Sequence, residues 1–130
     1  MSHASFFDHH HQLLQALYQH CVKQLPFCDD RASEVDIEFL ETLKALSEAT
    51  SSSDLFEQQG QSMICRIVTH YQHITPSVNR DLFWFFGGEC LHYMADEELA
   101  LYQQLDERLY EAGNEAVDYA ALKASIFQLH

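Results

Sequence analysis

Apolar residues recur at intervals of three and four along most of the chain, which is the spacing of an amphipathic helix. Glycine and proline, which interrupt regular elements, number only four and two in 130 residues. This pattern predicts an all-α protein. The predicted helices span residues 5–25, 34–48, 54–73, 79–94, 96–111 and 118–129. We expect them to form one domain over residues 1–130, a bundle of five or six helices joined by short loops.

Residues with strong helix-ending or helix-capping preferences place several of these boundaries. Pro26 ends the first helix, because proline disfavours a helical turn before it. Ser33 supplies a side-chain oxygen that can cap the second helix. Gly60 lies on the apolar face of the third helix, where the missing side chain lets another helix approach closely.

The segment at about 80–94 is apolar almost all round, and we expect one continuous helix at the centre of the bundle. Gly87 and Gly88 would allow a tight helix crossing or a kink within it. The four consecutive aromatic residues at 83–86 cannot all face one core, so one side would meet a second helical layer or another protein, for instance in a homodimer. The predicted interaction surface or pocket contains Phe83, Trp84, Phe85, Phe86, Tyr93 and Tyr102.

The charge of the chain narrows the classes of partner. Seven basic and twenty acidic residues give a net charge of −13. Nucleic acids and anionic membranes bind proteins through Lys and Arg, so neither is an expected partner. The sequence contains no secretory signal, no membrane-spanning apolar run and no C-x-x-C pair among its four cysteines. These features predict a cytoplasmic protein with reduced thiols.

One short motif raises the question of metal binding. Glu89 and His92 are three residues apart, so they project from the same side of a helix. Carboxylate-bridged iron and manganese bundles use this Glu-x-x-His spacing twice, with two further glutamates. Here Asp8 and His11 form only a weak second copy, on the polar side of the first helix. A standard two-metal centre is therefore not predicted.

A mononuclear metal site is the looser alternative. His10 lies in the middle of the apolar stripe of the first helix, while His9 flanks that stripe toward the outside. Glu89, His92 and Glu98 are also expected to point inwards, and the set would suit iron, manganese or zinc. In the alternative without metal, His10 is a hydrogen-bonded core histidine, Glu98 a residue of a first helical turn, and the other two a local pair.

Several motifs of enzyme active sites are absent from the sequence. No G-x-G-x-x-G or G-x-S-x-G occurs, and no strand precedes Gly87 and Gly88, so a nucleotide-binding loop of the common kinds is not predicted. Cys90 and His92 are two apart and lie on different faces of a helix, which excludes a Cys–His nucleophile pair within it.

The stretch "DLFWFFGGECLHYMADEELALYQQLDE", residues 81–107, resembles a family of small acidic all-α proteobacterial proteins of unknown function. Some of its members carry a dehydrogenase label. The resemblance implies a small helical protein of bacterial type, but it brings no catalytic residues that could be transferred to this chain.

The function predicted first is protein–protein interaction or regulation, with the chain binding itself or another protein and performing no catalysis. The first alternative is a metal-dependent oxidoreductase or hydrolase built around the four predicted ligands. The second alternative is a small-ligand binder with an aromatic pocket between the fourth and fifth helices.

Overall fold

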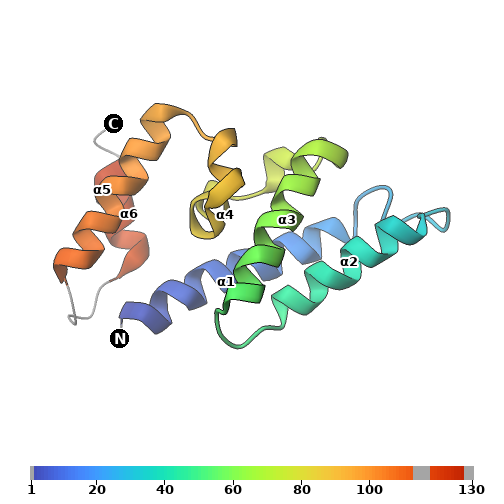
Figure 1. The fold of residues 1–130 in the computed structure, drawn as a ribbon, viewed down its shortest axis with the longest axis horizontal. Coiled ribbons are helices and arrows are strands. Elements are labelled where there is room, and N and C mark those ends of the chain that lie inside the picture. The colour runs from blue at the N-terminus through green and yellow to red at the C-terminus, as the bar shows by residue number, and fades with distance from the viewer. Residues whose placement is uncertain (1, 113–117, 128–130) are drawn as a thin grey trace.

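The computed structural model describes residues 2–112 and 118–127 (Figure 1). Within these ranges every regular element is helical, which confirms the predicted all-α class. The elements are α1 (Ser2–Cys21), α2 (Glu34–Ser47), α3 (Asp54–His70), η1 (Thr75–Ser77), α4 (Arg80–Phe86), η2 (Gly88–Tyr93), α5 (Asp96–Ala112) and α6 (Tyr119–Phe127). Residues 128 and 129, predicted to end the last helix, lie outside the described part of the chain.

The long helix α1 connects the two ends of the molecule (Figure 1). It packs against α2 toward one end, and against α4 and α6 toward the other. Helix α3 contacts both α2 and α4, while α5 and α6 form a pair near the beginning of α1. Helices α1 to α5 contribute fully buried side chains to one core, among them Leu14, Phe39, Ile64, Leu82 and Tyr102.

Side-chain caps explain where three of the helices begin. The Ser33 hydroxyl accepts a bond from the Asp36 amide, and the Asp36 carboxylate accepts one from the Ser33 amide, so the two residues form a reciprocal capping box. Ser53 and Asn79 cap α3 and α4 in the simpler way. The predicted cap at Ser33 is thus confirmed.

Two predicted helices are shorter at their carboxyl ends than the sequence pattern suggests. Helix α1 ends at Cys21, and the chain continues in turns up to Pro26. Helix α3 ends at His70, because Tyr71 leaves the helical region with φ −130° and ψ 54°. The Tyr71 ring packs against the Phe39 ring, with 5.0 Å between the ring centroids. The end of the helix at His70 allows this contact.

The predicted continuous helix over 80–94 is wrong. Helix α4 ends at Phe86, because Gly87 adopts φ 64° and ψ −148°, a region that is essentially restricted to glycine. Gly88 also has a positive φ, of 56°, and the chain resumes as the 3₁₀ helix η2. The two glycines therefore do more than kink a helix, since they end one and redirect the residues that follow.

The close approach predicted at Gly60 is confirmed. A methyl group built on Gly60 would lie 2.0 Å from a ring carbon of Phe86. The next residue, Gln61, donates its side-chain amide to the Phe86 carbonyl at 2.8 Å. Helix α3 therefore holds the end of α4 through both a ring contact and a hydrogen bond.

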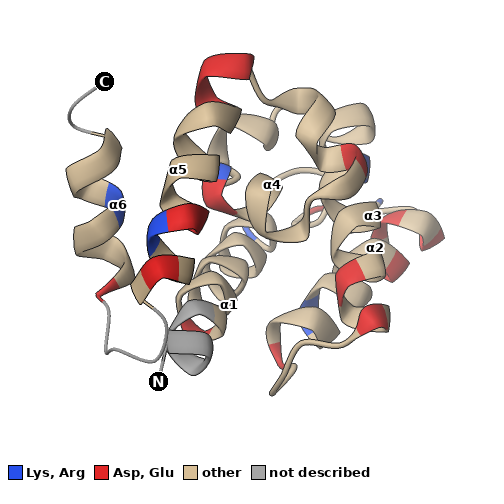
Figure 2. Cartoon of the chain, turned by 60° about the vertical axis from the view of Figure 1, so that its left-hand side comes forward, with Lys and Arg blue, Asp and Glu red and all other residues tan. Residues whose placement is uncertain are grey.

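Acidic residues are spread over most of the helices, and basic residues are few (Figure 2). No helix in the described part of the chain has the length and apolar character needed to cross a membrane.

Candidate functional site: a buried carboxylate and an aromatic pocket

The most deeply buried charged residue described is Asp81, in the first turn of α4, with 1% of its surface exposed. Its backbone amide is bonded to the Asn79 side chain at 2.9 Å, so the cap of α4 fixes where this residue lies. An acidic side chain in a first helical turn also interacts favourably with the helix dipole.

Three other helices supply hydrogen bonds to the Asp81 carboxylate. His9 of α1 lies with Nε2 2.9 Å from Oδ2. Tyr102 of α5 donates its hydroxyl to Oδ1 at 2.5 Å, and Lys123 of α6 donates its ammonium to the same oxygen. We call these four residues the Asp81 cluster. It joins α1, α4, α5 and α6 at a single carboxylate.

The electrostatics of the cluster favour the ionised carboxylate. Burial alone would raise the pKa of Asp81, but the bonds from Lys123, Tyr102 and His9 together hold that pKa below its ordinary value. Burial, and then the bond to Asp81, raise the pKa of Tyr102 well above its ordinary value. Tyr102 is therefore a neutral donor, and Lys123 supplies the positive charge that a buried carboxylate requires.

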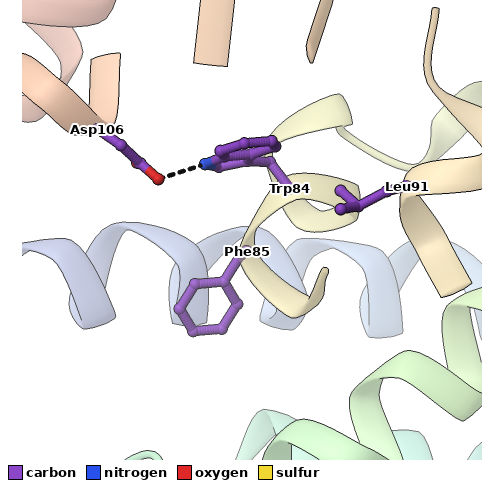
Figure 3. Close-up of a pocket in the computed structure, with 4 residues that line it drawn as sticks. All are labelled: Trp84, Phe85, Leu91 and Asp106. Atoms are coloured by element: carbon purple, nitrogen blue, oxygen red, sulfur yellow. Dashed lines mark hydrogen bonds between the residues drawn. The ribbon is translucent and has the colours of Figure 1, made fainter. Parts of the chain in front are cut away.

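An open pocket of about 230 Å³ lies beside this cluster, lined by Trp84, Phe85, Leu91 and Asp106 (Figure 3). We call it the aromatic pocket. Helix α4 contributes its two rings, η2 contributes Leu91, and α5 contributes Asp106. The Trp84 indole donates Nε1–H to Asp106 Oδ2 at 3.1 Å (Figure 3).

The two rings of the aromatic pocket are packed against the residues around Asp81. Trp84 stacks on Tyr102 with 5.6 Å between ring centroids and 19° between planes. Phe85 stacks on His10 with 4.5 Å and 10°. Both rings are half-buried, so each has part of its surface in the core and part toward the pocket.

Among the described residues that line the pocket, Asp106 alone has a carboxylate. Its side chain is exposed at the rim, yet enough protein surrounds the carboxyl that desolvation raises its pKa, while the Trp84 hydrogen bond opposes that rise. No ion pair joins Asp106 to any residue in the ranges that the structure describes. The pocket thus combines two aromatic walls with a carboxylate lacking a cationic partner among those residues.

Two larger hollows lie elsewhere, and each contains a polar side chain that is already hydrogen-bonded within the chain. A hollow of about 380 Å³ between α1 and α2 is crossed by Gln15, whose amide bonds the Ser47 carbonyl at 3.3 Å. Another, of about 330 Å³, contains Asp36, which accepts a hydrogen bond from the Tyr71 hydroxyl at 2.6 Å. Neither combines stacked aromatic walls with an unpaired carboxylate.

The structure does not bring the four predicted metal ligands together. Glu89 and His92 form an exposed pair at 3.3 Å, because η2 turns them outwards after the glycines. Glu98 is bonded twice by the Arg80 guanidinium, at 2.9 and 2.8 Å. His10 alone is buried, as the pattern of α1 predicts.

A different trio has the spacing of metal ligands. In the described ranges, the one group with ligand atoms within 4.8 Å of one another is His9, His10 and Asp81. Lys123 already contacts Oδ1 of Asp81, so a metal ion at this trio would compete with an ammonium for the same carboxylate. The arrangement favours the ion pair.

The six residues of the predicted aromatic surface divide into three groups. Phe83, Phe86 and Tyr102 are buried in the core of the single chain. Trp84 and Phe85 line the aromatic pocket. Tyr93 is 37% exposed. The aromatic run therefore fills a core and builds a pocket wall within one chain.

The residues that sequence reasoning missed are Asp81, Lys123 and Asp106. One signal was available for Asp81: it lies three and four positions before Trp84 and Phe85, so it shares a helix face with aromatic residues. For Lys123 and Asp106 no local signal exists, because their partners lie 42 and 22 residues away.

Comparison with protein families shows a match between residues 2–129 and the model of the PA2817-like family. No curated protein and no solved structure matches the chain. A family resemblance, first visible in residues 81–107, is thus confirmed over almost the whole chain. The bacterial origin and the dehydrogenase label remain predictions.

Proposed function

The chain belongs to the PA2817-like family, and from this premise we propose that it is a binding protein for a small molecule, held in the aromatic pocket. The observation that carries the proposal is the composition of that pocket: two aromatic rings, one leucine and one carboxylate around about 230 Å³. Ligand sites are concave, mainly apolar and equipped with a few polar groups that fix orientation. The modest volume favours a fragment-sized ligand.

The contacts that link Trp84 to helix α6 support a regulatory role, in which a bound ligand would alter how α6 is held. Trp84 stacks on Tyr102, and Tyr102 donates to the carboxylate that also holds Lys123 of α6. A ligand that shifts the Trp84 ring would therefore act on the residues that dock α6. Such a ligand changes the docking equilibrium only by its difference in affinity for the docked and undocked forms.

The proposal is tested with the fluorescence of Trp84, which is the only tryptophan of the chain. We expect that some members of a panel of fragment-sized aromatic and aliphatic compounds change its emission in a saturable way. Leu91→Phe, which fills the pocket without adding a second tryptophan, should abolish the change. Leu55→Phe is the matched control, because Leu55 is 63% exposed on α3.

Two results would contradict the proposal. One is a panel in which no compound binds. The other is binding that Leu91→Phe leaves intact, since that would place the ligand outside the aromatic pocket.

Protein–protein interaction, including self-association, is a second candidate function. It is supported by large apolar side chains that remain exposed, above all Tyr110 on α5 at 88%. Leu25 at 59% and Leu55 at 63% lie on other segments of the chain. Size-exclusion chromatography with light scattering tests the self-association form: a dimer that Tyr110→Ser weakens would support it, and a monomer at high concentration would contradict it.

All four cysteines are free thiols, which supports a reducing location such as the cytoplasm as part of this proposal.

A further inference from the structure

We infer that the aromatic pocket selects a small organic ammonium ion, an inference that rests on the binding function proposed above. The pocket offers what such a cation needs: aromatic walls for its alkyl groups and a carboxylate for its charge. Three features favour such a cation: the Trp84 ring, the Asp106 carboxylate and the charge of helix α5.

The Trp84 ring is the first of these features. Tryptophan is the aromatic side chain that attracts cations most strongly, through the negative face of its π system. Tyr102 covers one face of the ring, and Trp84 also lines the pocket. Within the described ranges, the cations that lie over rings belong to Arg66, Arg80 and Lys123, and none of them lies over Trp84.

The Asp106 carboxylate is the second feature. The Trp84 indole bonds Oδ2 at 3.1 Å, and no residue of the described ranges bonds Oδ1. The same bond joins the carboxylate to the nitrogen edge of the ring, so the charge lies at the border of the aromatic surface (Figure 3). A cation in the pocket would supply the charge partner that Asp106 lacks among the described residues.

The negative charge of helix α5, which carries Asp106, is the third feature. Helix α5 carries six acidic residues and one basic residue, Arg108, and the whole chain has a net charge of −13. No lysine or arginine is among the described residues that line the aromatic pocket. An anionic ligand would meet repulsion here, whereas a cation would be attracted over several ångströms.

The rings and the carboxylate together favour an alkylated ammonium over a metal ion. A divalent metal ion prefers several oxygen or nitrogen ligands, and the described part of this lining offers one carboxylate. An alkylated ammonium loses little hydration on entry, and its methyl groups fill apolar space that a hydrated inorganic ion would leave unused. Charge and shape therefore point to the same class of ligand.

The experiment compares choline with 3,3-dimethyl-1-butanol, which has the same shape but carries carbon in place of the charged nitrogen. Both are titrated into the full-length protein, with Trp84 fluorescence as the signal and with equal sodium chloride as the control for ionic strength. We expect choline to bind about tenfold more tightly than the neutral compound, the difference that a partly desolvated cation–π contact provides.

Two variants test whether the preference for choline over the neutral compound depends on the Asp106 carboxylate. Asp106→Asn keeps an oxygen that accepts the Trp84 bond but removes the charge, and we expect the preference for choline to fall to about twofold or less. Glu107→Gln makes the same change of charge at the next position of α5, outside the pocket lining, and should leave the preference intact.

The outcomes separate the two proposals. Equal binding of both compounds would overturn the choice of a cation while leaving the pocket a binding site. No binding of choline would also overturn it, and the fragment panel would then decide on the pocket itself. An undiminished preference in Asp106→Asn would show that the recognition does not use this carboxylate, and would overturn the inference as argued.

Discussion

The ammonium group of Lys123 on α6 contacts the carboxylate of Asp81 at the beginning of α4, 42 residues earlier in the chain. Asp81 is 1% exposed, whereas the Lys123 side chain is 26% exposed. The buried Asp81 carboxylate needs a positive partner, and Lys123 supplies it. This ion pair therefore attaches the short helix α6 to the rest of the fold. Its ring contacts add to this, with Phe127 packing on Tyr102 at 5.0 Å.

Replacing Lys123 by Met should lower the free energy of unfolding by about 3 kcal/mol, because Asp81 would remain buried without a charged partner. Urea unfolding followed by circular dichroism measures the change. Lys23→Met is the matched control, since Lys23 is exposed after the end of α1. Adding Asp81→Asn to Lys123→Met should recover part of the loss, because it removes the uncompensated charge. A double variant as unstable as the sum of its single variants would contradict this account.

The stability of the protein should depend on the ionisation of Asp81 at acid pH. The pKa of Asp81 in the folded chain lies below the value of about 3.9 expected when the chain is unfolded. Below that unfolded value the unfolded chain takes up a proton that the folded chain excludes. The contribution is therefore fully present above the unfolded pKa and is lost as the pH falls through the folded pKa.

We expect Asp81→Asn to be less stable than the wild type near neutral pH and to lose less further stability on acidification. Urea midpoints and slopes measured between about pH 7 and pH 3 give the comparison. Asp30→Asn provides a control for loss of one exposed carboxylate. Parallel curves for the wild type and Asp81→Asn would show that Asp81 does not carry this dependence.

The sequence pattern predicts those features of the fold that depend on interactions between residues close together in the chain. The all-α class and the beginnings of α2, α3 and α5 follow from helical periodicity and capping residues such as Ser33. The inward direction of His10 follows from its place in the apolar stripe of α1. An aromatic pocket between the fourth and fifth helices is one alternative that the sequence predicts, and Trp84 and Phe85 of the predicted set line the pocket described above.

The remainder could not be predicted, because it depends on contacts between distant helices. His9 lies on the flank of the stripe, and only the position of α4 turns it into a partner of Asp81, 72 residues away. The break after Phe86 depends on positive φ values at two glycines, and a helical pattern on either side conceals it. That break carries Glu89 and His92 away from His10, so the predicted metal site depended on an incorrect helix.

Replacing Gly60 by Ala should destabilise the protein, although the same change usually stabilises a helix by about 1 kcal/mol. The new methyl group would lie 2.0 Å from the Phe86 ring, which is itself buried. We expect a net loss of about 1–3 kcal/mol from overpacking, measured by urea unfolding. Gln59→Ala, at an exposed neighbouring position, should change stability by no more than about 0.5 kcal/mol.

The assignment of this clash to Phe86 can be checked with a second variant. Phe86→Leu shortens the side chain over Gly60, so it should make Gly60→Ala less costly than it is in the wild-type background. An equal cost in both backgrounds would place the strain elsewhere.

The four free cysteines should differ widely in their reaction with maleimide. Burial raises the pKa of Cys21 to about 11, and burial together with Cys65 raises the pKa of Cys90. Near pH 7.5 these two thiols carry little thiolate and are also inaccessible, whereas Cys28 is exposed. Mass spectrometry of the labelled native protein should show Cys28 modified first, and Cys21 and Cys90 modified only as the chain unfolds. In urea all four should react at similar rates, and labelling of native Cys21 or Cys90 as fast as Cys28 would contradict the packing described for α1 and η2.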